Sequence, residues 1–320
     1  MKKITVLGAG HWGLALASVL ASNNKEVLMY ARDDKKALDL NLRHESVYIK
    51  DYKFSELIKA TSNLDEAIEF SDTIIISIPV VSVYMTLLPY LKKFPNKNYV
   101  FTSKGLYNGK TMSSLFYNVN KDLHLAVLSG PSFSNEVIEK KNTAVVIASK
   151  NSSLAKELQC DFSNNYFRVY TSEDITGVET CGAIKNVFAI ICGMVDGAKM
   201  GSNTKNALIT RGLAEMKRMI TFTGGNLETL YGLAGIGDIM LTCNSFESRN
   251  YSYGFQYTSG KKSEASGVVE GLNTIKELHT ISELNKIDMP ITNSLYEVLF
   301  NNKDIREMGY ELMNRKLKNE

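Results

Sequence analysis

Short apolar runs, separated by longer segments of mixed character, divide the first half of the chain. The run at residues 72–78 (Asp-Thr-Ile-Ile-Ile-Ser-Ile) is rich in β-branched residues, as in a strand buried on both faces, and Pro79 ends it. Segments between the runs, such as residues 14–21 and 80–93, have the composition of helices. This alternation predicts a doubly wound α/β domain with a mostly parallel sheet. The predicted strands are residues 4–7, 26–30, 72–78, 99–103, 123–128, 143–149 and 166–170.

The pattern changes near residue 176. Between residues 178 and 198 apolar side chains fall on almost every face of a helix, which predicts a helix buried within a domain or between two. The remainder is expected to be mostly helical, with a glycine-rich break at residues 231–238 and a polar loop from residue 245 to about residue 266. We therefore predict two domains, residues 1–176 and residues 177–320, of which the second is mainly α-helical.

Composition limits the classes of protein that fit this chain. Its 320 residues are 44% hydrophobic and 22% charged, which is ordinary for a globular protein large enough for two cores. The 37 basic and 34 acidic residues give a formal charge of +3, too even a balance to favour nucleic acid or a membrane surface as a partner. No apolar run approaches ~18 residues and no signal peptide is recognisable, so we expect no stable membrane insertion.

The four cysteines show no metal-binding spacing. They form no C-x-x-C motif and have no histidine pair nearby. We interpret them as buried thiols in a reducing compartment, which predicts a cytoplasmic protein with no metal site. They are Cys160, Cys181, Cys192 and Cys243.

A glycine motif joins the first predicted strand to the first predicted helix. Gly8, Gly10 and Gly13 have the G-x-G-x-x-G spacing of a Rossmann-type dinucleotide site, in the strand–turn–helix context that the motif requires. The first glycine permits the tight turn, the second lets the backbone approach a pyrophosphate, and the third allows close packing of helix on strand. The helix N-terminus attracts the phosphates. The sequence therefore predicts NAD or NADP as cofactor.

The end of the second predicted strand bears on the choice of cofactor. Arg32 could pair with the 2′-phosphate of NADP, while Asp33 keeps NAD possible through the ribose hydroxyls. The alternative is that Arg32 is merely solvated and Asp33 caps the following helix. Since ligands bind beyond the carboxyl ends of parallel strands, Lys104, Gly130 and Ser132 are placed to line the site.

Three residues of the second half could carry chemistry. Lys185 shares an apolar helical face, where burial would lower its pKa toward the range useful for proton transfer; alternatively its ammonium reaches solvent or a buried carboxylate. Asp238 fits a helix N-cap, or could face Lys185. Arg249 lies between Ser248 and Asn250 and suits a phosphate, unless it is an exposed loop residue.

Together the motifs resemble those of bacterial NAD(P)-dependent glycerol-3-phosphate dehydrogenases along nearly the whole chain. Each motif is weak alone, but their order and spacing are specific. They are residues 8–13 (Gly-Ala-Gly-His-Trp-Gly), 103–106, 129–133 (Ser-Gly-Pro-Ser-Phe), 182–186 (Gly-Ala-Ile-Lys-Asn), 207–213, 232–238 (Gly-Leu-Ala-Gly-Ile-Gly-Asp), 241–243, 248–250 (Ser-Arg-Asn), 269–271 (Val-Glu-Gly) and 289–291.

This resemblance implies reversible hydride transfer between a nicotinamide and C2 of dihydroxyacetone phosphate or sn-glycerol 3-phosphate, which supplies the backbone of phospholipids. It implies that Lys185 is the catalytic lysine, that Lys104 lies near both cofactor and substrate, and that Asp238 acts beside them. The implied substrate contacts are Lys104, Gly130, Ser132, Lys185, Asp238, Ser248, Arg249 and Asn250. The implied cofactor contacts are Gly8, Gly10, His11, Trp12, Gly13, Arg32, Lys104, Ser134, Arg249, Val268 and Glu270.

The chain departs from the family pattern at a few positions and leaves other functions open. His11 replaces a small hydroxyl residue, and its larger ring leaves the cofactor preference open. Ser134 replaces an alanine beside a cofactor contact, a change that we expect to be mild. One alternative interpretation is a reductase of a non-phosphorylated keto acid, which predicts no role for Arg249. Another is a dinucleotide sensor without turnover. Such a sensor would be expected to lack Lys104, Lys185 or Asp238, and all three are present. The apolar second domain is compatible with a homodimer.

Overall fold

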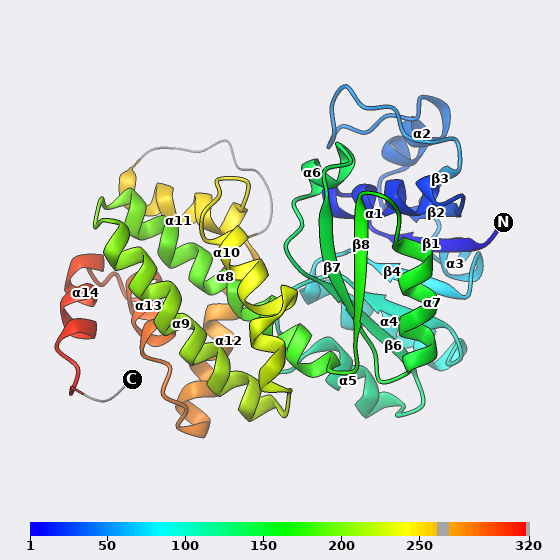
Figure 1. Ribbon diagram of the computed structural model, residues 1–320. Helices are drawn as coiled ribbons and strands as arrows, with labels where there is room; N and C mark the ends of the chain where they lie inside the picture. Colours follow the sequence, from blue (N-terminus) through cyan, green and yellow to red (C-terminus); the bar gives the residue numbers. More distant parts are fainter. Residues whose placement is uncertain (261–268, 318–320) are drawn as a thin grey trace. The chain divides into compact units, whose positions relative to one another are not determined.

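A computed structural model describes residues 1–260 and 269–317 of the chain (Figure 1). The chain divides into two compact units: Met1–Lys104 with Lys110–Glu179, and Gly105–Gly109 with Thr180–Glu320. The helix α8 (Ile175–Gly197) begins in the first unit and continues in the second.

The first unit is built on one eight-stranded sheet with the order β3-β2-β1-β4-β5-β6-β7-β8. Neighbouring strands are parallel except for β6 and β7, so the predicted doubly wound, mostly parallel sheet is confirmed. The strand order reverses at β1: β2 and β3 lie on one side of it, and β4 and the later strands lie on the other. Folds of this kind bind their ligands at this reversal, between β1 and β4. The strands are β1 Lys3–Leu7, β2 Glu26–Tyr30, β3 Ile58–Thr61, β4 Thr73–Ile76, β5 Asn98–Phe101, β6 His124–Ser129, β7 Thr143–Ala148 and β8 Phe167–Ser172.

Helices fill the connections between these strands. The first of them, α1, is buried from Gly13 to Ala21, which explains its apolar sequence. Asp33 caps α2 by accepting hydrogen bonds from the backbone N–H groups of Lys35 and Lys36. The helices that precede α8 are α1 His11–Ser22, α2 Asp34–Leu42, α3 Leu64–Glu69, α4 Val80–Lys93, α5 Met112–Val119, α6 Ser134–Ile138 and α7 Ser152–Phe162.

One strand of the sheet was not predicted. The edge strand β3 is four residues long, and its side chains alternate between buried Ile58 and Ala60 and exposed Lys59. An edge strand with one solvated face lacks the continuous apolar run of a central parallel strand. Because the segment is short and includes a charged residue, its pattern did not predict a strand.

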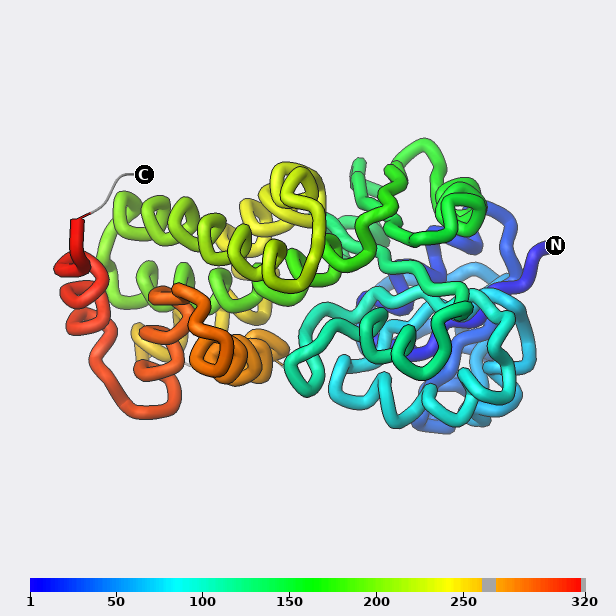
Figure 2. Tube along the Cα trace, turned by 90° about the horizontal axis from the view of Figure 1, so that it is seen from below, coloured from blue at the N-terminus to red at the C-terminus, as the bar shows by residue number. Residues whose placement is uncertain are grey.

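The second unit is helical, as predicted (Figure 1). Figure 2 shows α8 and α9 alongside each other, and Gly212 of α9 contacts the Phe188 ring of α8. The remaining elements are α9 Ser202–Thr223, a 3₁₀ helix η1 Leu227–Tyr231, a π-helical turn η2 Leu233–Gly237, α10 Asp238–Thr242, α11 Arg249–Ser259, α12 Glu270–Asn285, α13 Pro290–Phe300 and α14 Ile305–Met313.

The predicted loop over residues 245–266 is wrong for most of its described part. Residues 249–259 form α11, which Ser248 caps by accepting a hydrogen bond from the N–H of Tyr251. Small residues let α11 lie directly on α8: a Cβ on Gly254 would be 1.9 Å from the Ile190 carbonyl oxygen, and one on Gly193 would be 2.0 Å from the Tyr251 carbonyl oxygen. The polar composition hid this packed face. Residues 261–266 lie outside the described part.

The glycine-rich break at residues 231–238 is also ordered helical structure. It forms the end of η1, then η2, and then the first residue of α10. Gly235 makes this possible, because a Cβ there would lie 2.1 Å from the Leu230 carbonyl oxygen. The break therefore places Asp238 at a defined position at the start of α10.

Helix α8 is long and apolar enough to cross a membrane by composition, contrary to our expectation that no run approaches that length. Yet 94% of its most apolar 18-residue window is buried inside the protein. A buried core helix meets the same length and hydropathy criterion, and α8 has the packing of one.

Candidate active site

The glycine turn after β1 has one open position and two closed ones. Gly8 has φ +110°, and a Cβ there would lie 2.6 Å from the Ser77 carbonyl oxygen. A Cβ on Gly13 would lie 1.9 Å from the Gly8 carbonyl oxygen. In contrast, a Cβ on Gly10 would meet nothing within 4 Å, and α1 begins at the next residue. The open space over Gly10, in front of a helix N-terminus, fits a pyrophosphate.

This difference predicts opposite effects for two similar substitutions. We expect Gly10→Ala to leave the melting temperature of the protein within ~2 °C of wild type and to weaken NADPH binding at least tenfold, because the methyl group occupies the space for the pyrophosphate. Gly13→Ala should instead destabilise the fold itself, because its methyl group collides with a backbone oxygen. Thermal unfolding and fluorescence titration with NADPH measure both effects. Equal NADPH affinity for Gly10→Ala and wild type would exclude this turn as the pyrophosphate site.

Two residues that the sequence analysis missed lie beside the turn. The His11 ring contacts that of Tyr48 at 5.2 Å between centroids, and Lys36 donates a hydrogen bond to the Tyr48 hydroxyl at 2.7 Å. Lys36 thus adds a cation to the same end of the sheet as the exposed Arg32. No motif marks Tyr48, because it lies in the connection from α2 to β3 and joins this group only through the fold. Trp12 is partly buried against the apolar core of the unit.

A second predicted group gathers at the ends of β5 and β6. The Lys104 ammonium lies 3.4 Å from the Gly130 carbonyl oxygen, and the Ser132 hydroxyl donates to that same oxygen at 3.1 Å. Gly130 has φ +136°, and a Cβ there would approach Cα of Val145 to 3.0 Å, so only glycine fits. The structure therefore brings these three predicted residues together. Ser134 follows them as the first residue of α6.

In the second unit, Lys185 and Asp238 form a buried ion pair. The Lys185 ammonium lies 2.5 Å from Oδ1 of Asp238 and donates to the Thr242 hydroxyl at 2.8 Å. The side chains of Lys185 and Asp238 are only 9% and 1% exposed. Of the alternatives left open by the sequence, the contact with a carboxylate is the one observed. Gly237 is the N-cap residue of α10 and Asp238 is its first residue, so the N-cap interpretation is wrong.

Thr242 is a further member of this group that the sequence analysis did not assign. Its hydroxyl lies 2.6 Å from the Asp238 carbonyl oxygen, one helical turn earlier in α10, and 2.8 Å from the Lys185 ammonium. The spacing of four residues from Asp238 could have identified it, because residues i and i+4 share a helix face. A buried ammonium held by a carboxylate and a hydroxyl is fixed in position, which suits it for proton transfer to a bound substrate.

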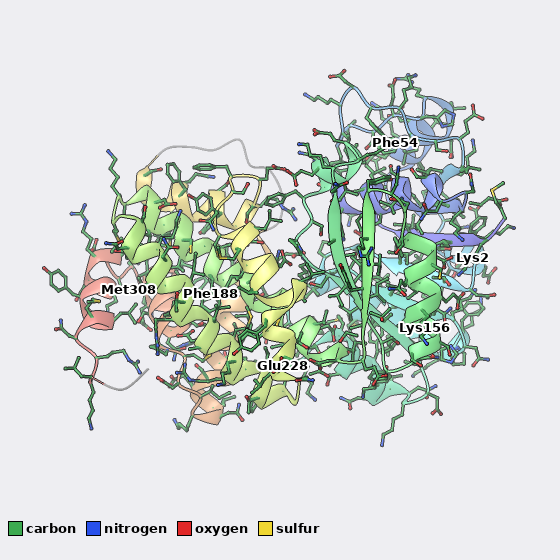
Figure 3. The ribbon with its side chains drawn as sticks, in the orientation of Figure 1. Lys2, Phe54, Lys156, Phe188, Glu228 and Met308 are labelled. Atoms are coloured by element: carbon green, nitrogen blue, oxygen red, sulfur yellow. The ribbon has the colours of Figure 1, made fainter. Side chains whose placement is uncertain are left out.

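Packing around the lysine fixes α8 in place. Phe188, one turn after Lys185, is fully buried among the helices of the second unit (Figure 3). A Cβ on Gly212 would lie 2.8 Å from the Phe188 ring, so the glycine of the motif at 207–213 makes room for this ring.

Burial, with a hydrogen bond to Cys192, raises the pKa of the nearby Cys243 thiol well above its usual value. Cys160 is exposed, which corrects the expectation of four buried thiols.

The residues Ser248, Arg249 and Asn250 lie at the start of α11. Ser248 is its N-cap, and the exposed Arg249 is its first residue. The Arg249 side chain has no ion pair or hydrogen bond with any residue that the structure describes. A cation at a helix N-terminus is disfavoured by the helix dipole, and a bound dianion would reverse that cost. Glu270 is the first residue of α12, whereas Val268 lies outside the described part of the chain.

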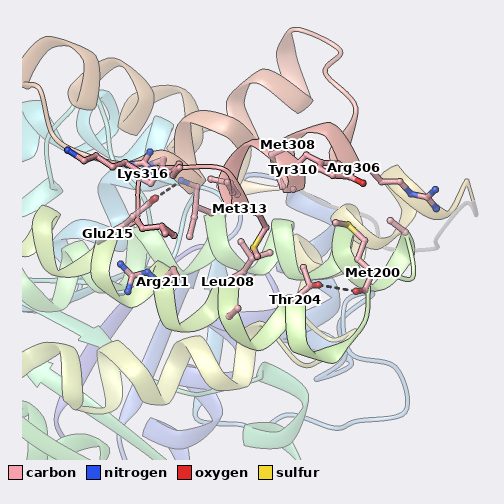
Figure 4. Close-up of a pocket in the computed structure, with 18 of the residues that line it drawn as sticks. Met200, Thr204, Leu208, Arg211, Glu215, Arg306, Met308, Tyr310, Met313 and Lys316 are labelled. Carbon is pink, nitrogen blue, oxygen red and sulfur yellow. Dashed lines mark hydrogen bonds between the residues drawn. The ribbon is translucent and has the colours of Figure 1, made fainter. Parts of the chain in front are cut away.

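A separate cavity in the second unit contains none of the predicted site residues. Its volume is about 1300 Å³, and α9 and α14 provide much of its lining (Figure 4). Glu215, on its wall, accepts hydrogen bonds from the N–H groups of Ile291 and Thr292 and so caps α13; burial raises the pKa of Glu215 to about 7. Two of its arginines, Arg218 and Arg315, pair with Asp288.

Within the described residues, no group of three or more metal-binding side chains is present.

The sequence matches two family models. One describes the N-terminus of NAD-dependent glycerol-3-phosphate dehydrogenase and covers residues 3–155; the other describes the C-terminus and covers residues 174–309. Among curated proteins, glycerol-3-phosphate dehydrogenase [NAD(P)+] of Staphylococcus epidermidis is 40% identical over the full length of both chains. The protein of that name from Staphylococcus aureus is 39% identical, also over the full length of both.

Solved structures agree with these matches. Glycerol-3-phosphate dehydrogenase from Coxiella burnetii is 34% identical with a TM-score of 0.91, over 98% of this chain and 99% of that one. A probable 2-dehydropantoate 2-reductase from Bacillus subtilis is 16% identical with a TM-score of 0.56, over 94% of this chain and 100% of that one, which shows a shared fold only.

Proposed function

This chain belongs to the family of NAD(P)-dependent glycerol-3-phosphate dehydrogenases, and we propose how its own residues perform the reaction of that family. The reaction is reversible hydride transfer between NAD(P)H and C2 of dihydroxyacetone phosphate, which gives sn-glycerol 3-phosphate. The observation that carries the proposal is the buried ion pair of Lys185 and Asp238 in the second unit. In the same unit, the side chain of Arg249 lies at the start of α11 and has no partner among the described residues. We assign cofactor binding to residues 1–176 and substrate binding mainly to residues 177–320.

Lys185 is the proton donor for the C2 oxygen. When C2 of the ketone gains a hydride, its oxygen becomes an alkoxide and needs one proton. The Lys185 ammonium supplies this proton in the reductive direction, and the neutral amine removes it in the oxidative direction. Asp238 and Thr242 hold the ammonium by contacts of 2.5 and 2.8 Å, so its position is fixed before the substrate arrives.

The substrate phosphate is bound by the start of α11. The guanidinium of Arg249 supplies a fork of N–H donors, Asn250 supplies an amide, and the first N–H groups of α11 add a partial positive charge. Ser248 fixes the helix start as its cap. The predicted contacts of Gly130 and Ser132 with substrate, and of Lys104 with the developing alkoxide, complete the proposed set; a nearby cation stabilises that charge most in the transition state.

The cofactor contacts come from the glycine turn. The open space over Gly10 fits the pyrophosphate, and the nicotinamide supplies or accepts the hydride when it is bound. Arg32 favours the 2′-phosphate of NADP, and Lys36, which donates to the Tyr48 hydroxyl, adds a second cation. The His11 ring contacts that same Tyr48, so we propose that it also affects the choice between the two cofactors. We retain both NADP and NAD as cofactors, and propose that His11, Trp12, Ser134, Arg249 and Glu270 contact whichever is bound.

The cellular setting follows from this chemistry. The product is the glycerol phosphate from which phospholipids are built, so we propose a cytoplasmic enzyme of lipid synthesis. Two observations support this location: the free cysteines and the burial of α8 within the protein. We propose no nucleic acid or membrane partner, and we keep a homodimer as a proposal.

A steady-state assay at 340 nm tests the proposed function. We expect the purified protein to consume NADPH, and separately NADH, when dihydroxyacetone phosphate is added. Unphosphorylated dihydroxyacetone should be reduced at least 100-fold less efficiently, because it lacks the dianion that Arg249 binds. Turnover of a 2-keto acid but not of dihydroxyacetone phosphate would favour the keto-acid reductase instead. NADPH binding without turnover of any ketone would favour a sensor.

A further inference from the structure

Three segments with proposed functions meet at one glycine of the second unit. Gly271 is the second residue of α12, directly after Glu270. A Cβ built on it would lie 2.7 Å from Cδ1 of Ile190, 2.8 Å from Oδ1 of Asn250 and 2.9 Å from the carbonyl oxygen of Asn186. The first turn of α12 therefore lies in direct contact with α11 and with α8 immediately after Lys185. No side chain larger than hydrogen fits there without moving one of these segments.

A hydrogen bond at this junction fixes the orientation of Asn250. The Gly271 N–H donates to Oδ1 of Asn250 at 3.0 Å, and the Asn250 side chain is buried. Within the described residues, Nδ2 of Asn250 has no partner. Because an amide has one accepting and one donating end, the bond to Gly271 uses the acceptor and leaves the donor for a ligand. The donor is the end that can bind a phosphate oxygen.

We propose that Asn250 and Gly271 form a coupling element, through which the substrate phosphate and the cofactor strengthen each other's binding. A phosphate on Nδ2 of Asn250 holds the amide, the amide holds the Gly271 N–H, and Gly271 is covalently joined to Glu270. Both ligands thus favour the same position of the first turn of α12, so the binding of either one stabilises the position that the other needs. This inference rests on the proposed function, since it takes the phosphate at Asn250 and the cofactor at Glu270. Asn250 and Gly271 act here as positioning residues.

The non-reacting pair of NADPH and sn-glycerol 3-phosphate tests the coupling. Both are in the reduced state, so they can occupy the wild-type enzyme together without turnover. Fluorescence titration gives the Kd of NADPH with and without saturating sn-glycerol 3-phosphate. We expect the second ligand to lower this Kd at least fivefold in wild type. In Gly271→Ala the ratio should fall below twofold, because the methyl group displaces α12 from Asn250 while both proposed ligand contacts stay chemically intact.

A matched glycine substitution separates coupling from general perturbation. Gly309→Ala in α14 adds the same methyl group, which would meet only the flexible Met200 methyl at 3.1 Å, and it should retain the wild-type ratio. If Gly271→Ala does not fold, Asn250→Ala removes both the acceptor of the Gly271 bond and the proposed phosphate donor without adding bulk. At saturating sn-glycerol 3-phosphate, which compensates for the weaker phosphate contact, it should also give a ratio below twofold. A wild-type ratio near one, or an unchanged ratio in Gly271→Ala and Asn250→Ala, overturns the coupling alone. Failure of wild type to bind sn-glycerol 3-phosphate overturns both the coupling and the proposed function.

Discussion

Replacement of Lys185 by methionine is expected to lower kcat for dihydroxyacetone phosphate reduction roughly 1000-fold, within the range by which general acids accelerate reactions. Methionine has nearly the length of lysine and no proton to give, so it removes the chemistry and keeps most of the volume. The Kd for NADPH should stay within about threefold of wild type, because the proposed pyrophosphate contact lies in the first unit. Single-turnover absorbance and NADPH titration measure the two quantities.

The buried partner of Lys185 complicates this substitution and also supplies its control. Loss of the ammonium leaves the Asp238 carboxylate buried and unpaired, which costs about 3–5 kcal/mol in comparable pairs. The double variant Lys185→Met/Asp238→Asn removes that charge and should regain thermal stability without regaining turnover. Recovery of turnover to a tenth of wild type in the double variant would mean that Lys185 serves the fold and not the reaction.

The fold was predictable from the sequence wherever burial is continuous. The central strands and α8 are apolar on almost every face, so their patterns have one explanation. Prediction failed where an element has one solvated face or packs through small residues. The strand β3 has alternating exposure at the edge of the sheet, and α11 owes its position to Gly193 and Gly254, which permit backbone contact. Glycines suggested breaks in the chain, but here they allow close packing.

The candidate site, like the fold, could be predicted from the sequence only in part. The glycine motif was visible because its backbone geometry requires glycine at fixed spacing. Lys185 was visible as a cation on an apolar face, but its contact with Asp238 joins residues 53 positions apart and follows only from the packing of α8 against α10. Tyr48 and Lys36, and the Gly271 contact of Asn250, carry no local signal for the same reason. Sequence spacing identifies chemical groups, and the fold decides which of them meet.

Replacement of Arg249 by alanine should raise the KM for dihydroxyacetone phosphate roughly 30- to 900-fold. This range corresponds to about 2–4 kcal/mol, the cost of truncating one partner of a charge pair that is desolvated by binding. At saturating NADPH, which compensates for the proposed cofactor contact of Arg249, the loss should fall on the phosphorylated substrate, because the Arg249 side chain has no partner among the described residues whose contact would be broken. Arg249→Lys should show a smaller loss, since an ammonium keeps the charge but not the planar fork.

Two comparisons make the Arg249 result specific. Arg306→Ala, in the first turn of α14, removes another exposed arginine of the same unit and should leave the KM within twofold of wild type. With NADPH saturating, unphosphorylated dihydroxyacetone should be reduced with equal efficiency by Arg249→Ala and by wild type, because it has no phosphate for Arg249 to bind. If Arg249→Ala weakened both substrates alike, the arginine would act through the cofactor or the fold. A KM within twofold of wild type would place the phosphate elsewhere, and the start of α11 would then lose its proposed role.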